Sequence, residues 1–332
     1  MHSSPPDIVM SDTAAAQPDD VSAAKLMVVI NPGSGVHDTQ QTRDLLKQIF
    51  NESGRAFEFV SVEGPQALDK ASAKAAGDAV KSGDVLVAVG GDGTINTVAQ
   101  AAWRAGCVLA VLPQGTFNYF GRSFGIPQDL EAAARALVRG RPEAVQVGDV
   151  NGRLFLVNAS LGLYPQLLQD REAFKKKFGR HRWVAMLSGL MTVFKWRRQL
   201  VLEIELDGKR TVLTTPTLFV GNNHLQFAQI GIDENTAGRV GDGRLAAIAS
   251  KPIGTWSMIG LLLRGAFGRL GDAEQVQSFS CRTLTVNVRG RRRVKLAADG
   301  EVHQAVPPLR FAVSSTTLML VRPRIEDRVA VE

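Results

Sequence analysis

The segment VLVAVGGDGTINTVAQAA, residues 85–102, decides the fold of this chain. Its first five residues form a continuous apolar run, which is typical of a strand buried on both faces of a parallel sheet. The apolar residues after the glycines have the i, i+3, i+4, i+7 spacing of one helix face: Ile95, Val98, Ala99 and Ala102. The segment therefore predicts a strand, a tight glycine loop and a helix.

Apolar runs and helical patterns alternate on both sides of this segment. Further strands are predicted at 26–30, 57–62 and 108–112, with helices over 39–50 and 66–81 between them. This alternation predicts an α/β N-terminal domain with a doubly wound parallel sheet, in which ligands bind beyond the carboxyl ends of the strands.

The pattern changes after about residue 147. Short β-type runs follow one another, and Asp207-Gly208 between two of them predicts a two-residue hairpin. These runs predict a β-rich, sandwich-like C-terminal domain, with strands at 153–159, 201–206, 217–220, 244–249, 276–280, 283–288 and 294–298. The predicted organisation is a disordered tail over 1–24, an α/β domain over 25–147 joined by a strand near 315–324, and a β-rich domain over 148–314.

Basic charge is concentrated in an insert over residues 171–200. The insert has nine basic residues and one acidic residue, a net charge of +8, whereas the whole chain carries +7. Aromatic residues lie between these cations, which predicts contact with an anionic membrane surface; the alternative is a solvated helix that packs on the β-rich domain. A second basic cluster predicts either a phosphate contact or a solvated hairpin: Arg289, Arg291, Arg292, Arg293 and Lys295.

Composition narrows the class of protein further. Two cysteines exclude a disulfide scaffold, and no apolar stretch reaches the roughly 20 residues of a membrane-spanning helix. These features predict a cytoplasmic protein that contacts the inner membrane surface peripherally. No nucleic acid is expected as a partner, because no recognisable nucleic-acid module is present.

Three glycine-rich loops follow predicted strands. They are Asn31-Pro-Gly-Ser-Gly35, Gly90-Gly-Asp-Gly-Thr94 and Pro113-Gln-Gly-Thr-Phe-Asn118. Glycine allows a ligand close to the backbone, whose N–H groups bind phosphate oxygens at the start of a helix. Each loop alone is equally well explained as a tight turn, but three at one sheet edge predict a phosphate site. Neither a P-loop nor a dinucleotide fingerprint is present.

Taken together, the ordered motifs resemble the diacylglycerol kinase catalytic-domain family, which includes sphingosine and ceramide kinases. The resemblance extends from Lys25 to Arg322 through Gly221-Asn222-Asn223, Gly241-Asp-Gly-Arg-Leu245 and Ala298-Asp-Gly-Glu301. It implies ATP contacts at the loops and at the end of the second strand: Asn31, Gly33, Ser34, Gly35, Ser61, Gly90, Gly91, Asp92, Gly93, Thr94, Asn96, Thr97, Gly115, Thr116 and Asn118.

The resemblance also implies catalytic and metal sites. The Asp-Gly-Glu turn makes Asp299 or Glu301 the general base, and Asp92 is placed in sequence to hold a catalytic Mg²⁺ ion. A structural metal is implied at Asp242 with the backbone carbonyls of Arg239 and Arg244. Two positions depart from the family pattern, since Tyr119 stands where an Asp is usual and Gly241 precedes Asp242.

The predicted function is that of an ATP-dependent lipid kinase. It would transfer the γ-phosphate to the hydroxyl of diacylglycerol or a related lipid alcohol. Two alternatives stay open: an enzyme of the NAD kinase kind with a soluble substrate, and a non-catalytic lipid-binding regulator with the same fold.

Overall fold

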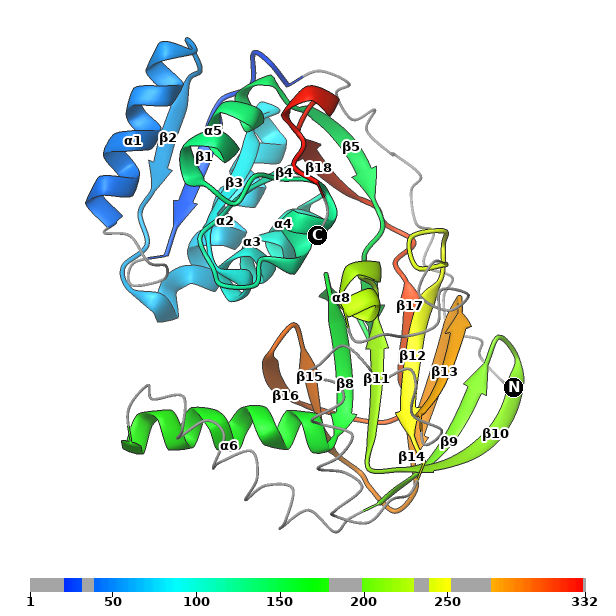
Figure 1. Ribbon diagram of the computed structural model, residues 1–332. Helices are drawn as coiled ribbons and strands as arrows, with labels where there is room; N and C mark the ends of the chain where they lie inside the picture. The colour runs from blue at the N-terminus through cyan, green and yellow to red at the C-terminus, as the bar shows by residue number, and fades with distance from the viewer. Residues whose placement is uncertain (1–20, 32–38, 179–198, 230–238, 252–275, 331–332) are drawn as a thin grey trace, which may run out of the picture.

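An α/β domain and a β sandwich make up the described part of the chain (Figure 1). The computed structural model describes residues 21–31, 39–178, 199–229, 239–251 and 276–330. Both predicted fold classes are confirmed. Residues 1–20 of the predicted tail and residues 179–198 of the basic insert lie outside the described residues.

A six-stranded, mostly parallel sheet forms the centre of the α/β domain. Its order is β2-β1-β3-β4-β18-β5, and only β5 runs antiparallel to its neighbour. The strands are β1 (Leu26–Ile30), β2 (Phe57–Val60), β3 (Val85–Gly90), β4 (Val108–Pro113), β5 (Arg141–Val145) and β18 (Leu318–Arg322). β18 lies between β4 and β5, within the segment that the sequence predicted to join this domain.

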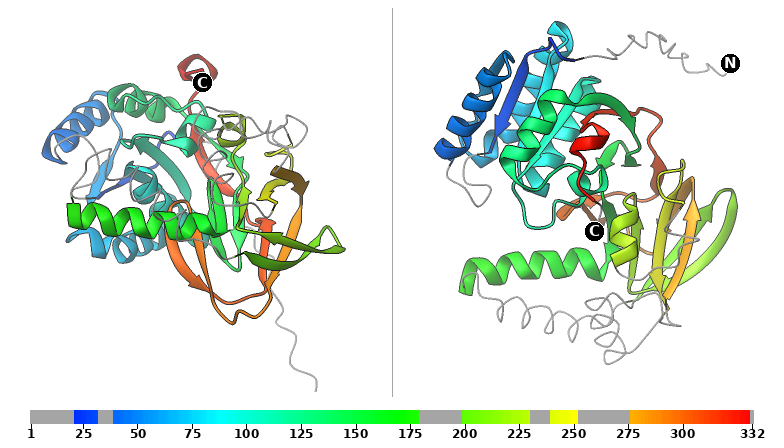
Figure 2. Two further views of the ribbon diagram at one scale, coloured as in Figure 1. Left: turned by 60° about the horizontal axis from the view of Figure 1, so that its bottom comes forward. Right: turned by 45° about the horizontal axis from the view of Figure 1, so that its top comes forward.

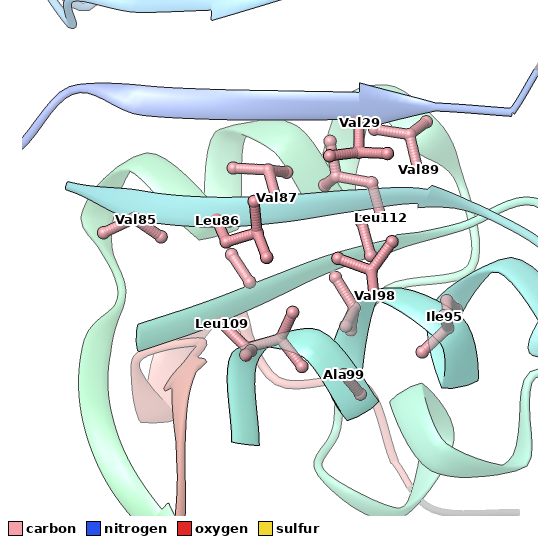
Figure 3. Packing of buried hydrophobic residues seen from close by; sticks show 14 of the residues in the cluster. Val29, Val85, Leu86, Val87, Val89, Ile95, Val98, Ala99, Leu109 and Leu112 are labelled. Atoms are coloured by element: carbon pink, nitrogen blue, oxygen red, sulfur yellow. The ribbon is translucent and has the colours of Figure 1, made fainter. Parts of the chain in front are cut away.

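Helices cover the sheet and supply the other half of its core. They are α1 (Thr39–Glu52), α2 (Leu68–Ser82), α3 (Asp92–Ala105), α4 (Tyr119–Ser123) and α5 (Leu130–Arg139), with a short 3₁₀ turn η1 at Pro65–Ala67. Figure 3 shows Val98 and Ala99 of α3 packed against Leu109 and the strands around it. Each residue of β3 is buried, which confirms the continuous apolar run as a central strand.

Two antiparallel sheets of six strands each form the sandwich. One has the order β10-β9-β14-β17-β6-β7 and the other β13-β12-β11-β8-β15-β16. The strands are β6 (Gly148–Val150), β7 (Arg153–Phe155), β8 (Asn158–Gly162), β9 (Leu200–Leu206), β10 (Lys209–Thr215), β11 (Thr217–Gly221), β12 (Leu245–Ser250), β13 (Val276–Cys281), β14 (Thr283–Val288), β15 (Val294–Ala298), β16 (Glu301–Ala305) and β17 (Leu309–Val313). Buried side chains from both sheets form one hydrophobic cluster.

Several local expectations differ from the structure. The predicted strand over 153–159 is divided into β7 and β8. The division occurs because the N–H groups of Leu156 and Val157 donate hydrogen bonds to a carboxylate and not to a neighbouring strand. The predicted tail over 1–24 ends in a described turn, in which Val21 is buried in the core of the α/β domain. The Asp207-Gly208 hairpin is confirmed, with positive φ at both residues.

Two further described helices lie beside the sandwich, and a 3₁₀ turn follows the last strand of the parallel sheet. α6 (Leu163–Phe178) begins directly after β8 and runs beside the β15–β16 hairpin, as Figures 1 and 2 show. α8 (His224–Gln229) contacts α4 of the other domain, and η2 (Ile325–Asp327) follows β18. Among the described helices, none combines the length and the apolar character needed to cross a bilayer.

Candidate active site

The predicted glycine loops meet at one edge of the parallel sheet. β1, β3 and β4 are parallel neighbours, so their carboxyl ends lie side by side. Asn31, at the end of β1, donates a hydrogen bond from Nδ2 to Thr94 Oγ1 at 3.2 Å. Gly33, Ser34 and Gly35 of the same loop lie outside the described residues.

Gly91 and Gly115 bring the second and third loops into direct contact. A Cβ atom on Gly115 would lie 3.0 Å from the Gly91 Cα and 2.6 Å from Asn118 Oδ1. Neither distance leaves room for a methyl group, so the approach of the two loops requires glycine.

The first turn of α3 places the backbone N–H groups of a helix start at this edge. The helix begins at Asp92, and its N-cap residue Gly91 has no side chain to accept from the first N–H groups. Unpaired N–H groups at a helix start and the positive end of the helix dipole attract phosphate oxygens. Gly90, Gly91, Asp92, Gly93 and Thr94 therefore lie where the sequence predicted a phosphate site.

Asn118 shapes the third loop. Its backbone has a left-handed φ of 48°, and its side-chain Oδ1 accepts from the Gly115 N–H at 2.9 Å. Its Nδ2 donates to the Gly115 carbonyl at 3.0 Å and to Gln128 Oε1 at 2.8 Å. Because these partners occupy the amide, its side chain organises the loop that was predicted to bind ATP.

Asp92 joins the two loops through its carboxylate. Its Oδ2 accepts from the Asn118 N–H at 3.1 Å, and burial raises the pKa of this carboxyl above its ordinary value. Mg²⁺ is usually held by one or two carboxylates together with substrate phosphates. A single half-buried carboxylate beside a helix N-terminus, where substrate phosphates would bind, fits such an ion.

The other predicted ATP contacts lie at the rim of the same edge. Ser61 is exposed directly after β2, and Thr116 is exposed in the third loop. Thr97 is half-buried in the second turn of α3. Tyr119 stacks on Phe117 with the ring planes 2° apart.

Asp299 links the two domains. It occupies the turn between β15 and β16 with a left-handed φ of 45°. Its carboxylate accepts from three successive backbone N–H groups, those of Leu156, Val157 and Asn158, at 2.7, 2.9 and 2.9 Å. Asn96 of α3 donates to the same carboxylate at 2.5 Å. Asn96, which was predicted to contact ATP, thus holds the Asp-Gly-Glu turn against the α/β domain.

Burial dominates the electrostatics of Asp299. It raises the pKa of this carboxyl to about 6, although the four hydrogen bonds act in the opposite direction. A carboxyl that titrates near 6 is a stronger base than an ordinary Asp and is still largely ionised at neutral pH.

Glu301 has a different environment two residues further on. Its Oε2 lies 3.5 Å from Arg153 Nη2 and 3.5 Å from His303 Nε2. His303 and Arg153 hold the pKa of the Glu301 carboxyl below its ordinary value. Glu301 is therefore ionised but a weaker base than Asp299.

Asn223 forms a second link between the domains. Its Nδ2 donates to the Tyr119 carbonyl and to Ser123 Oγ, both at 3.1 Å, from the turn that precedes α8. Contacts at Asp299 and at Asn223 thus hold the sandwich to α3 and α4, the helices that follow two of the glycine loops.

Hydrogen bonds from a glutamine close the loop that was predicted to bind a structural metal. The Arg239 carbonyl accepts from the Asp242 N–H at 3.3 Å, and the Arg244 carbonyl accepts from Gln146 Nε2 at 3.1 Å. Gln146 Oε1 also accepts from the Gly243 N–H at 2.8 Å. Within the described ranges, no three His, Cys, Asp or Glu side chains are grouped to hold a metal ion. The Gln146 amide thus bridges this loop, and the structural metal stays a prediction.

Sequence reasoning missed Gln146, Arg153 and the backbone donors at Leu156, Val157 and Asn158. Gln146 contacts a loop almost 100 residues away, and Arg153 contacts Glu301 across 148 residues. Neither residue lies in a glycine loop or a spaced motif, so no local signal marks it.

Comparison with known proteins adds to this geometry. Residues 25–150 match the diacylglycerol kinase catalytic domain. The resemblance that the motifs indicated is therefore confirmed. A diacylglycerol kinase from Bacillus subtilis is 32% identical over 185 residues, which are 55% of this chain and 59% of the relative. One from Staphylococcus saprophyticus is 31% identical over 144 residues, 42% of this chain and 46% of the relative. The chain thus matches about half of the length of these curated relatives.

Solved structures extend the match to the sandwich. A crystal structure of a diacylglycerol kinase from Bacillus anthracis superposes with a TM-score of 0.65 at 19% identity and covers 90% of this chain and 96% of that one. The likeness to this diacylglycerol kinase shows that both domains share its fold.

Proposed function

We propose that the protein is an ATP-dependent lipid kinase that transfers the γ-phosphate to the hydroxyl of diacylglycerol or a related lipid alcohol. The observation that supports this most is the contact of Asp299 with Asn96. Through this contact the Asp299 carboxylate of the sandwich, whose raised pKa suits a general base, lies about one helical turn from the glycine loop at the start of α3. That loop of the α/β domain is the one predicted to bind phosphate.

The N–H groups at the start of α3 and the loop around Gly115 would bind the phosphates of ATP. Phosphoryl transfer depends mainly on such positioning and on neutralisation of charge. Asp92 is the residue that would hold a Mg²⁺ ion, which when bound supplies positive charge to the β- and γ-phosphate oxygens.

Asp299 would accept the proton of the lipid hydroxyl. Three of its four hydrogen-bond donors are fixed backbone groups, whereas the fourth is the side chain of Asn96, which can rotate to admit a hydroxyl. Glu301 is the weaker candidate, because Arg153 and His303 stabilise its ionised form.

A lipid substrate brings the protein to a membrane. ATP and membrane lipids meet at the inner membrane surface, where we expect the protein to act in peripheral contact with anionic lipid.

The experiment that tests this proposal uses ATP labelled in the γ-phosphate. The full chain is offered diacylglycerol, other lipid alcohols and NAD, and the product is extracted and identified. We expect label in the lipid fraction and none with Asp92→Asn. Label in NAD would indicate the soluble-substrate alternative, and ATP binding without turnover on any lipid would indicate a regulator.

A further inference from the structure

A pocket of about 310 Å³ lies in the sandwich at the opposite end of β15 from Asp299. Its apolar part is formed by Leu161, Leu200, Val288 and Val294, and its basic part by Arg291, Arg293 and Lys295. We call it the basal pocket. β15 and β8 connect it to the candidate active site, and four to five residues of strand separate the two by about 15 Å.

The positive charge of the basal pocket is not neutralised by the described part of the chain. Arg291 and Arg293 are exposed, and neither forms an ion pair with a described carboxylate, whereas the neighbouring Arg289 pairs with Glu203 at 2.9 Å. Among the described residues no Asp or Glu lines the pocket, so its three cations give this lining a formal charge of +3.

Lys295 is oriented by neutral groups. Its Nζ donates to Gln166 Oε1 at 2.8 Å and to Gln169 Oε1 at 2.5 Å, both on α6. Gln166 in turn donates to Asp170 at 2.8 Å, which fixes its amide oxygen toward the ammonium group. An ammonium group has three N–H donors, so the third donor of Lys295 stays available for an anion.

Three of the five basic residues of this cluster line the pocket. Residues 291, 293 and 295 line it, whereas Arg292 between them is equally exposed and does not. Val294 also lines the pocket, so strand alternation does not account for this lining; Arg292 is an exposed basic neighbour outside it.

Positive charge next to aliphatic side chains favours an amphipathic anion as the ligand of this pocket. Leu161, Leu200 and Val288 belong to the core of the sandwich, so packing fixes the apolar side of the pocket in place. A volume near 300 Å³ is at the lower end for small-molecule sites, which suits a headgroup with the first part of one chain. We propose that the basal pocket binds the phosphate of an anionic phospholipid on Arg291, Arg293 and Lys295, with the start of an acyl chain on the apolar floor.

Such a site would hold the protein on the membrane without occupying the candidate active site. The inference rests on the proposed function only in that a lipid substrate gives membrane attachment a purpose. Binding at the basal pocket requires neither ATP nor turnover, so it is measured separately.

The test is flotation of the full chain with vesicles of phosphatidylcholine, with and without phosphatidylglycerol, in the absence of ATP. Arg291→Gln and Arg293→Gln are compared with Arg292→Gln, which removes the same charge from an exposed neighbour outside the pocket. Each basic residue near an anionic surface contributes about 1 kcal/mol, or roughly a fivefold change in binding. We expect binding that needs phosphatidylglycerol, a roughly fivefold or larger loss for the two pocket variants, and a loss below twofold for Arg292→Gln.

Other outcomes would overturn the inference. Equal losses for all three variants would indicate general surface charge, and binding indifferent to phosphatidylglycerol would exclude the site. Full displacement by glycerol 3-phosphate would indicate an anion site without lipid contact. If the two sites are separate, Arg291→Gln does not affect the phosphorylation of short-chain diacylglycerol in neutral detergent micelles. A wrong assignment of the basal pocket and a wrong assignment of the kinase activity therefore give different results.

Discussion

The two ends of β15 are opposite in chemistry. Beyond one end, Asp299 is a buried carboxylate whose neighbours are all hydrogen-bond donors. At the other end, Lys295 is a cation whose neighbours are neutral acceptors. The Asp299 carboxylate has its hydrogen bonds supplied by the protein and holds the two domains together. The Lys295 ammonium group, in contrast, keeps positive charge that a ligand can bind. One strand thus connects a rigid candidate reaction site to an incomplete binding site.

Replacement of Asp299 by Asn should have the largest effect. The amide would turn an NH₂ group toward N–H donors, so we expect a loss of about 1–3 kcal/mol in the free energy of unfolding. Removal of the proton acceptor should also lower kcat about 10²- to 10⁴-fold. Thermal unfolding and the labelled-phosphate assay measure the two effects.

Asp207→Asn is the matched control for this variant. Asp207 also has a φ of 45° in a hairpin turn and accepts from two backbone N–H groups, those of Arg282 and Thr283. We expect it to lose stability and to keep activity. Full activity in Asp299→Asn, or an equal loss in Asp207→Asn, would remove Asp299 from the reaction.

Gly115→Ala should have the next largest effect. The added methyl group would meet Asn118 Oδ1 at 2.6 Å and the Gly91 Cα at 3.0 Å, which forces the two loops apart. We expect the KM for ATP to rise by about 10- to 100-fold, since small displacements of binding groups have effects of this size. Gly77→Ala in α2 meets nothing within 4 Å and should leave KM unchanged; an unchanged KM in Gly115→Ala would contradict a phosphate role for these loops.

A smaller effect is expected from the loop around Asp242. Gln146→Leu would remove the bonds to Gly243 and Arg244 and lower stability by about 1–3 kcal/mol. Because that amide occupies the loop, a chelator should not change the unfolding temperature of the unmodified protein. A drop in unfolding temperature with EDTA, reversed by Mg²⁺, would show that a structural cation binds after all.

The smallest effect concerns the two thiols. Burial raises the pKa of both Cys107 and Cys281 to about 12, so neither is a thiolate at neutral pH. We expect almost no reaction with a thiol reagent in the native protein and two equivalents in denaturant. Fast native labelling of either cysteine would show that its strand opens readily.

The parallel sheet was the most predictable part of the molecule. β1, β3 and β4 are buried on both faces, so their sequences are continuous apolar runs that identify them directly. β5 was missed because it is an edge strand with the sequence RPEAV, in which charge and proline hide the pattern. Glycine loops after identified strands could then be assigned to one edge.

The environment of the candidate site was less predictable. Asp299 accepts from residues more than 140 positions away, and Gln146 bonds to the loop around Asp242 across almost 100 positions. Contacts of this kind depend on how two sheets pack, which no local spacing records. The basal pocket depends on which of the five cations of this cluster line it, and no local spacing in the sequence shows that.

The pH dependence of kcat/KM for lipid phosphorylation tests the central claim most directly. A general base acts when it is deprotonated, so the rate falls as the pH drops through its pKa. If Asp299 accepts the proton, kcat/KM declines about tenfold per unit below about pH 6. A profile that stays flat until below pH 4.5 would assign the proton to Glu301, whose pKa is lowered from that value, and would contradict the role given to Asp299.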